Sequence, residues 1–256
     1  MTDLVSSMSD GLNAFLDTSV ILSREFGPRQ KKKEIKSTLK GKRKTASTYS
    51  ITEVNRTFLK DAIFLYSILT EEPSLHTVFE RLQKFPMTER RIKRCLALLD
   101  KITDNRQIRI KTAMAKLENL IFGTKALLFR DVATVTSGTL CPLSQENVEF
   151  DYPAFKLNTS CTKSTATCSL AKYLKANTPK LLELKQAISS DPKMEKLCLV
   201  LEKAILDPNE AKGRRCQTLG DLIICLDAPY SSNVYSTNVK DFAVICHIVK
   251  KKFVKM

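Results

Sequence analysis

Short apolar runs and longer amphipathic stretches alternate along the chain, and their spacing predicts the secondary structure. The first apolar run, residues 12–16, ends at the carboxylate of Asp17, and we predict a short buried strand there, followed by a helix or turn. From Ser50 to Leu69, apolar residues recur on one helical face. Three further stretches share this period: 74–85, 88–103 and 106–130. The segment 131–169, rich in Ser, Thr, Cys and Pro, has no clear period, so we expect a long loop or an irregular excursion.

The last third of the chain carries clearer start signals. Thr178-Pro179 and Asp191-Pro192 each place a capping residue before a proline, which is typical of a helix N-terminus. After these two helices, the sequence predicts a short apolar helix in "TLGDLIICLDAP", a strand at 233–237, and a closing helix or strand at 241–249. Short strands among helices favour an α/β fold with a central, mainly parallel sheet flanked by helices.

The chain carries a large excess of positive charge, which indicates the kind of partner it would bind. The 256 residues carry a formal net charge of +15, which favours a polyanionic partner, nucleic acid before membrane, over the plainer interpretation of mere solubility. The charge is densest in "RQKKKEIKSTLKGKRK", residues 29–44, with nine basic residues against Glu34. This run is either a solvated loop or helix face, or a basic loop or arm that contacts phosphates. The nucleic-acid-binding side chains would be Lys31, Lys32, Lys33, Lys42, Arg43 and Lys44.

Cysteine usage and the lack of long apolar runs bear on the compartment. The eight cysteines form no C-x-x-C pair, and several fall within apolar periodic patterns, as buried reduced thiols do. The first ten residues have neither the basic region nor the apolar core of a signal peptide. No apolar run approaches the ~18 residues of a membrane span. We therefore expect a cytoplasmic protein with no disulfide framework and no membrane partner.

Acidic and amide side chains stand at the edges of the short apolar elements. Asp17 ends the first predicted strand, and Asn238 follows the last, with Asp241 three residues further on. Asp221 and Glu53 would each begin a helix. In an open parallel sheet, ligands bind beyond the carboxyl ends of the strands. We therefore expect these side chains to converge at one rim of the sheet.

Carboxylates that share a rim repel each other, so their pKa values should rise in the free protein. A hard divalent cation relieves this repulsion, and Mg²⁺ or Mn²⁺ prefers oxygen ligands and keeps some of its waters. Such an ion can orient a water for in-line attack on a phosphodiester and stabilise the leaving oxygen, and two ions about 4 Å apart would do both. Because His76 and His247 are the only histidines, we do not expect zinc.

The pattern "FLDTSVIL … SITEV … GDLIIC … VYSTNVKDF" resembles the PIN domain, a metal-dependent nuclease fold found in bacterial toxins of toxin–antitoxin pairs and in RNA-processing factors. The resemblance covers roughly residues 10–60 and 215–250. It implies a three-layer α/β/α fold for residues 10–256, with a helical insertion at about 70–190. It also implies Mg²⁺ or Mn²⁺ held by Asp17, Glu53, Asp221, Asn238 and Asp241.

The resemblance further implies roles for these residues. The protein would be an endoribonuclease of the toxin or RNA-processing type. Its catalytic carboxylates would be Asp17, Glu53, Asp221 and Asp241. Thr18 or Thr237 would position the metal-bound water or the phosphate. RNA is the expected substrate, an antitoxin or another protein is a candidate partner, and a homodimer is left open.

Two features depart from the simple family pattern. Glu53 and Asp221 are much further apart than in compact members, and Asn238 stands where many members have an aspartate. An amide oxygen can bind a cation but brings no charge, which Asp241 would have to supply. The second hypothesis is therefore a nucleic-acid-binding or complex-forming module whose catalytic site has decayed. A haloacid-dehalogenase-type phosphatase also starts with a strand ending in aspartate, but it needs a second aspartate where this chain has Ser19.

Overall fold

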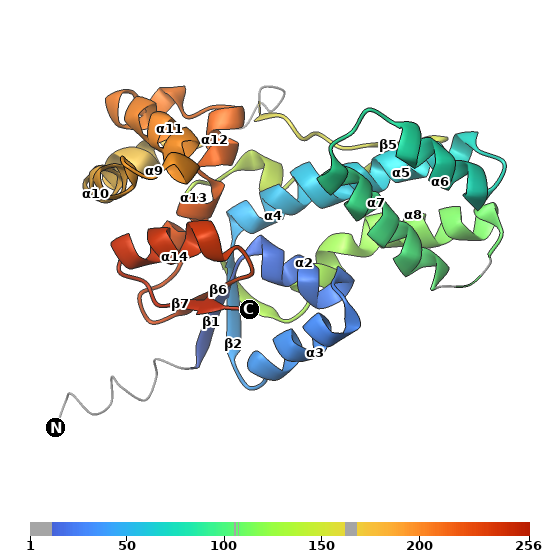
Figure 1. The fold of residues 1–256 in the computed structure, drawn as a ribbon, viewed down its shortest axis with the longest axis horizontal. Helices are drawn as coiled ribbons and strands as arrows, with labels where there is room; N and C mark the ends of the chain where they lie inside the picture. Colours follow the sequence, from blue (N-terminus) through green and yellow to red (C-terminus); the bar gives the residue numbers. More distant parts are fainter. Residues whose placement is uncertain (1–11, 105, 107, 162–167) are drawn as a thin grey trace. The chain divides into compact units, whose positions relative to one another are not determined.

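The computed structural model of the protein describes residues 12–104, 106, 108–161 and 168–256. The chain divides into two compact units, and Figure 1 shows its course along the sequence. Unit 1 comprises Met1–Thr52, Asp131–Gln145 and Ser160–Met256, and unit 2 comprises Glu53–Arg130 and Glu146–Thr159. The helical insertion expected at about 70–190 overlaps unit 2 over 70–130 and 146–159, and residues 160–190 group with unit 1.

Unit 1 is built around one five-stranded sheet. Its strands are β1 (Asn13–Leu16), β2 (Arg43–Ser47), β3 (Val132–Thr136), β6 (Asn233–Ser236) and β7 (Phe253–Lys255). They lie in the order β3-β2-β1-β6-β7, and every neighbouring pair is parallel. Because all strands point the same way, their carboxyl ends form one edge of the sheet and their amino ends form the other. The prediction of an α/β fold with a central parallel sheet is confirmed.

The helices of unit 1 lie mostly in the last third of the chain. The first two, α2 (Thr18–Phe26) and α3 (Arg29–Thr38), lie near its start. The later ones are α9 (Leu170–Ala176), α10 (Thr178–Ile188), α11 (Glu195–Leu206), α12 (Arg214–Thr218), α13 (Gly220–Asp227) and α14 (Val239–Ile248), with 3₁₀ turns at Pro142–Ser144, Pro192–Met194 and Pro208–Glu210. Helix α4 (Thr48–Val54) begins in unit 1 and ends in unit 2. The helices predicted from the two proline-containing start signals are confirmed, and the closing segment is a helix.

Apolar side chains are buried on both faces of the central strands. Successive side chains of a strand point to opposite faces, and Ala14, Phe15 and Leu16 of β1 are all fully buried. Phe15 and its register partner Val234 on β6 belong to a core formed with helices α9 to α14. Figure 1 shows α2 and α3 on one side of the strands and α13 and α14 on the other. A strand that is apolar on both faces requires cover on both sides, which these helices provide.

Unit 2 is helical apart from one hairpin. It contains a π-helical turn (Asn55–Leu59), α5 (Lys60–Glu71), α6 (Leu75–Lys84), α7 (Glu89–Thr103), α8 (Ile110–Phe129) and the antiparallel strands β4 (Glu149–Asp151) and β5 (Ala154–Lys156). The three helices predicted between residues 74 and 130 are confirmed. Asp61 on α5 is 2% exposed and pairs with Arg91 and Arg94 of α7 at 2.7 and 2.6 Å. A buried carboxylate of this kind depends on its partners, so the pair ties α5 to α7.

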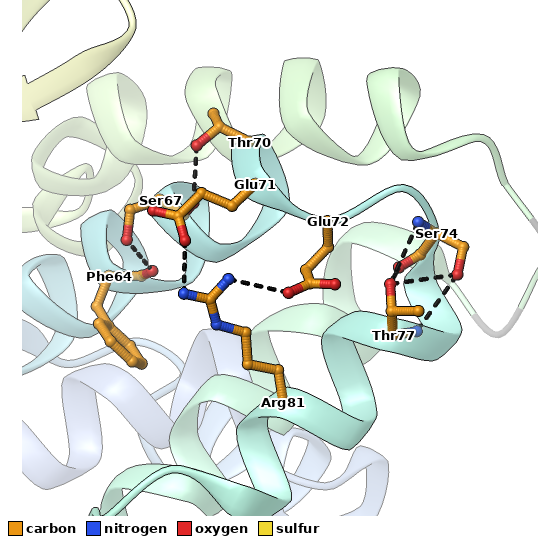
Figure 2. A network of polar contacts seen from close by, with 8 residues as sticks. All are labelled: Phe64, Ser67, Thr70, Glu71, Glu72, Ser74, Thr77 and Arg81. Atoms are coloured by element: carbon orange, nitrogen blue, oxygen red, sulfur yellow. Dashed lines mark hydrogen bonds and ion pairs between the residues drawn. The ribbon is translucent and has the colours of Figure 1, made fainter.

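A second polar network lies where α5 gives way to α6, and Figure 2 shows it from close by. The guanidinium of Arg81 lies between Glu71 and Glu72, at 2.5 and 2.9 Å. Ser74 caps α6 by accepting the backbone N–H of Thr77 at 3.3 Å. Because these groups are exposed or half-exposed, the ion pairs add little stability, and the cap defines where the helix starts.

Two expectations from the sequence were wrong. Val132–Thr136, inside the segment expected to be a loop, is strand β3 at the edge of the sheet. The basic run 29–44 is not a continuous loop or arm, because Arg29–Thr38 form α3 and Arg43 begins β2, with residues 39–42 as the turn between them; of the alternatives, the solvated helix face fits α3. Its apolar residues Ile35 and Leu39 are buried, so its lysines form the solvated face of an amphipathic helix. Across the described parts of the chain, no helix has both the length and the apolar character to cross a membrane.

Candidate active site

Asp17 lies at the carboxyl end of β1, the central strand of the sheet, and also caps helix α2. Its side chain is almost inaccessible, since the residue is 3% exposed. The Oδ2 atom accepts hydrogen bonds from the backbone N–H of Ser19 at 3.2 Å and from the hydroxyl of Ser236 at 2.8 Å. The hydroxyl of Ser19 donates to the same oxygen. The carboxylate between two apolar runs is thus held by one helix end and two hydroxyl groups.

Burial determines the electrostatics of Asp17. Loss of water raises the pKa of its carboxyl above the ordinary value of 3.8, against the opposing effect of the hydrogen bonds from Ser19 and Ser236. Keeping the carboxylate of Asp17 charged in the folded state therefore costs free energy. A cation beside this carboxylate would lower its pKa and remove part of that cost.

Asn238 connects two further carboxylates. It lies at the start of α14, two residues beyond the end of β6. Its Nδ2 donates to Oδ2 of Asp221 at 2.9 Å and to Oδ2 of Asp241 at 2.7 Å. Asp221 and Asp241 belong to the first turns of α13 and α14, where the positive end of the helix dipole stabilises carboxylates. All three side chains are half-buried, so solvent reaches them.

Two serines link Asp17 to this second group. Ser236, the last residue of β6, donates its hydroxyl to Asp17 and accepts the backbone N–H of Asn238 at 2.9 Å. The hydroxyl of Ser19 accepts the backbone N–H of Thr237 at 3.0 Å. A chain of hydrogen bonds therefore runs from Asp17 through Ser236 to Asn238, and from there to both outer carboxylates.

Four of the five predicted metal ligands thus lie together at the carboxyl ends of β1 and β6. They are Asp17, Asp221, Asn238 and Asp241. The fifth, Glu53, lies near the end of α4 rather than at a helix start, and it is the first residue of unit 2. The acid cluster, as we use the term below, therefore consists of these four residues of unit 1 together with Ser19 and Ser236, whose hydroxyls bind Asp17.

The hydroxyl groups in the acid cluster differ from the two that the sequence singled out. Thr18 is the buried first residue of α2, and the contact between Thr237 and Ser19 is made by the backbone of Thr237. Ser19 and Ser236 are the residues whose hydroxyls bind Asp17. The sequence signal for Ser19 was its position two residues after an aspartate, the offset of an Asx-type cap. Ser236 carried no signal of its own, because its role follows from the pairing of β1 with β6.

The basic run does not surround the acid cluster. Arg43 begins β2, so Lys42 and Arg43 lie at the amino edge of the sheet. Lys44 pairs with Asp131 at 3.3 Å, and residues 31–33 lie on α3. With four residues in β1, the two edges are separated by about 13 Å. Any contact of Lys42 or Arg43 with a nucleic acid therefore lies away from the carboxylates.

The donor atoms of the acid cluster are carboxylate, amide and hydroxyl oxygens, which suit Mg²⁺ or Mn²⁺ better than a softer metal. Among the residues that the structure describes, no group of three or more His, Cys, Asp or Glu side chains is arranged to hold a metal ion. The NH₂ group of Asn238 donates to both Asp221 and Asp241, so it lies where a cation shared by these two carboxylates would have to lie. Half a turn of this amide would place its oxygen there instead, and the set would then fit a hard cation.

Comparison of the chain with protein-family models, with curated proteins and with solved structures finds no match. The site is therefore interpreted from its own geometry. It is a cluster of three carboxylates, one amide and two hydroxyls at the carboxyl edge of a parallel sheet, where α/β proteins bind their ligands.

Proposed function

We propose that this chain is a PIN-like endonuclease that hydrolyses phosphodiester bonds of RNA with Mg²⁺ or Mn²⁺. The single observation that carries the proposal is the hydrogen-bonded chain from Asp17 through Ser236 and Asn238 to Asp221 and Asp241. It brings carboxylates from three elements to the ligand-binding edge of a parallel sheet. Aspartates that only stabilised the ends of three separate helices would not need to lie together, whereas aspartates that bind one shared ion must do so.

The side chains would divide the work by their exposure. A bound Mg²⁺ or Mn²⁺ supplies an activated water and stabilises the leaving oxygen. Asp221 and Asp241, half-buried in the first turns of two helices, are the carboxylates that would hold the ion. Asp17 lies deeper, fixed in one orientation by Ser19 and Ser236, and adds negative charge behind them.

RNA as substrate follows from two features of the sequence. The net charge of +15 favours a polyanion, and the resemblance to the PIN domain favours RNA over DNA. Toxin and RNA-processing roles both fit this activity, and an antitoxin or another protein would be the partner that regulates it.

A cleavage assay with one matched pair of variants tests the proposal. In Asp17→Asn the side chain keeps its shape but loses its charge and one of its two acceptor oxygens, so cleavage of a mixed RNA pool with Mn²⁺ should fall about 100-fold or more. Asp207→Asn is the control, because Asp207 also caps a short helix, by accepting the N–H of Asn209 at 2.9 Å, outside the acid cluster. It should cut at the rate of the wild type. Equal cleavage by wild type and Asp17→Asn contradicts the proposal.

One observation favours a second candidate, a PIN-like module that binds nucleic acid or a protein partner without cutting. Asn238 presents N–H groups, not an oxygen, to Asp221 and Asp241. In this arrangement each of the two carboxylates already has a hydrogen-bond donor from the protein. Wild-type chain that binds RNA yet leaves it intact at every Mn²⁺ concentration tried would support this candidate.

A further inference from the structure

A second surface of unit 1 lies at the amino ends of the strands. The loop after α13 enters β6 through Tyr230, and the loop after α14 enters β7 through residues 250–252. The backbone N–H of Val234 donates to the carbonyl of Lys252 at 2.8 Å, which holds the two loops side by side. We use the term amino-edge surface for Lys180 of α10, Tyr230, Lys250, Lys251 and Lys252.

Tyr230 is an exposed aromatic ring held in place by cations. The residue is 72% exposed. The ammonium group of Lys251 lies 3.4 Å from the ring centroid, and that of Lys180 lies 5.4 Å from it. Cations at these distances are attracted to the ring face, so they orient the ring and leave most of its surface to solvent. An oriented, exposed ring is a platform on which a nucleic-acid base can stack.

The cations beneath the ring lack a negative partner. Lys251 is 8% exposed, and its Nζ donates to the carbonyl of Ala228 at 2.6 Å. Burial, and then the charge of Lys180, lowers the pKa of Lys251 to about 8. In the ranges that the structure describes, no carboxylate forms an ion pair with a lysine of the amino-edge surface. An anion bound there would relieve the repulsion between these cations.

Positive charge continues along the same edge of the sheet. Lys250 and Lys252 are exposed. Lys42 and Arg43 lie at the amino end of β2, two strands away from β6 in the sheet. Aromatic rings interleaved with cations are the combination with which proteins hold single-stranded nucleic acids. A plain solubilising surface would need the charges but not the oriented ring.

We infer that the amino-edge surface binds single-stranded RNA, with one base stacked on Tyr230 and the adjoining phosphates against Lys180 and Lys252. The ring accepts any base and the lysines contact only phosphate, so binding is independent of sequence. The inference deepens the proposed function, and it rests on that function for the choice of RNA as partner. The surface would anchor the RNA at the end of β6 opposite the acid cluster.

Binding measured without cleavage tests the role of the ring. Fluorescence anisotropy is recorded in EDTA with the whole chain and a labelled oligouridylate of about 12 nucleotides. Tyr230→Ala should weaken binding about tenfold, whereas Tyr230→Phe, which keeps the ring, should stay within about twofold of the wild type. Tyr152→Ala is the matched control, because Tyr152 is 83% exposed and lies in unit 2 between β4 and β5. Wild-type affinity in Tyr230→Ala, or equal losses in Tyr230→Ala and Tyr152→Ala, overturns the inference.

The lysines are tested by the salt dependence of the same binding. Lys180→Gln and Lys252→Gln should each lower the slope of log K against log salt by about 0.7. Lys185→Gln is the control, because Lys185 lies on the same helix as Lys180 but pairs with Glu202 at 3.0 Å. Uridine monophosphate should displace the oligonucleotide at lower concentration than inorganic phosphate does. An unchanged slope in both lysine variants, or equal displacement by the two competitors, contradicts a site that uses base and phosphate together.

The inference and the proposed function fail in different ways. If cleavage is lost in Asp17→Asn but RNA binding is unchanged in Tyr230→Ala, the proposed nuclease activity is supported and the proposed RNA-binding surface is contradicted. If RNA binding is weakened in Tyr230→Ala but the wild type cuts no RNA, the RNA-binding surface is supported and the nuclease activity is contradicted.

Discussion

The side-chain nitrogen of Asn238 donates a hydrogen bond to Oδ2 of Asp221 over 2.9 Å. The same nitrogen reaches Asp241 at 2.7 Å, so one neutral amide separates two carboxylates that would otherwise repel each other. Position 238 is therefore where the two proposed functions differ most. A nuclease needs an oxygen there to face an ion, whereas a module that does not cut is complete with the N–H groups.

Asn238→Asp should destabilise unit 1 in EDTA and increase its response to Mn²⁺. The substitution removes a shared donor and adds a third negative charge beside Asp221 and Asp241, which should cost about 1–3 kcal/mol. A cation that binds the native state offsets this cost, so Mn²⁺ should raise the Tm of the variant more than that of the wild type. Calorimetry with and without Mn²⁺ measures both effects.

Asn209→Asp is the control for this prediction. Asn209 also donates its Nδ2 to an aspartate, Asp207, at 3.0 Å, but both residues are exposed. The substitution there should change the Tm little and should give no added response to Mn²⁺. If Mn²⁺ raises the Tm of neither the wild type nor Asn238→Asp, the acid cluster is not a metal site.

Asp17→Asn should stabilise the fold while it abolishes activity. Burial raises the pKa of Asp17 in the folded chain above its ordinary value of 3.8, so the folded state holds this proton more tightly than the unfolded state does. The contribution of Asp17 to stability is therefore complete at low pH and is lost as pH rises from about 4 through the raised pKa. An asparagine has no such loss, so the variant should gain roughly 0.5–2 kcal/mol at pH 7 and nothing near pH 3.

Urea unfolding at several pH values checks the prediction for Asp17. The stability difference between Asp17→Asn and the wild type should grow with pH and then level off. A difference that stays constant from pH 3 to pH 8 would show that Asp17 is not perturbed by burial. Asp207→Asn, at an exposed cap, should show no such growth.

The helices and strands that could be predicted from the sequence are those marked by nearby residues, such as a helix cap, a proline or a helical period. Proline and capping residues mark α10 and α11, and helical periods mark α6 to α8. Strands β2 and β7 had no such signal. Their sequences are short, and "RKTAS" begins with charged residues while "FVK" ends with one. They form strands because β2 pairs in parallel with β1 and β7 with β6. The convergence of Asp17 with Asn238 followed from the rule for strand ends, but the serines that join them depend on which strands are neighbours.

Neutralising the exposed lysines on α3 and in the turn that follows it should flatten the salt dependence of RNA binding. Lys33, Lys36 and Lys40 are exposed, and their joint replacement by glutamine should lower the slope by about 2 if all three contact phosphates. The control is Lys93→Gln, since Lys93 of unit 2 pairs with Glu89 at 2.6 Å. An unchanged slope in the triple variant would show that these lysines form only a solvated face.

The buried thiols should be inert in the native protein. Cys225 and Cys246 are fully buried, with their sulfur atoms 3.5 Å apart on α13 and α14. Burial, together with the hydrogen bond to Cys246, raises the pKa of Cys225 well above its usual range. A pulse of N-ethylmaleimide followed by mass spectrometry should therefore modify the half-buried Cys198 and leave Cys225 and Cys246 unmodified until urea is added. Native labelling of Cys225 as fast as Cys198 would show that α13 and α14 separate readily.

Gly138→Ala should destabilise unit 1, because Gly138 lies against a half-buried polar contact. The hydroxyl of Tyr173 donates to Asp227 at 2.8 Å, and a Cβ on Gly138 would overlap both of these side chains. Tight packing leaves no room for them to move apart, so we expect a loss of about 1–3 kcal/mol. Gly123→Ala is the opposite case: Gly123 lies in the middle of α8 with open space at its Cβ position, and alanine should gain roughly 0.5–1 kcal/mol there. Hydrogen exchange of amides in each unit separates the two effects, and equal protection of unit 1 in Gly138→Ala and the wild type would contradict the first.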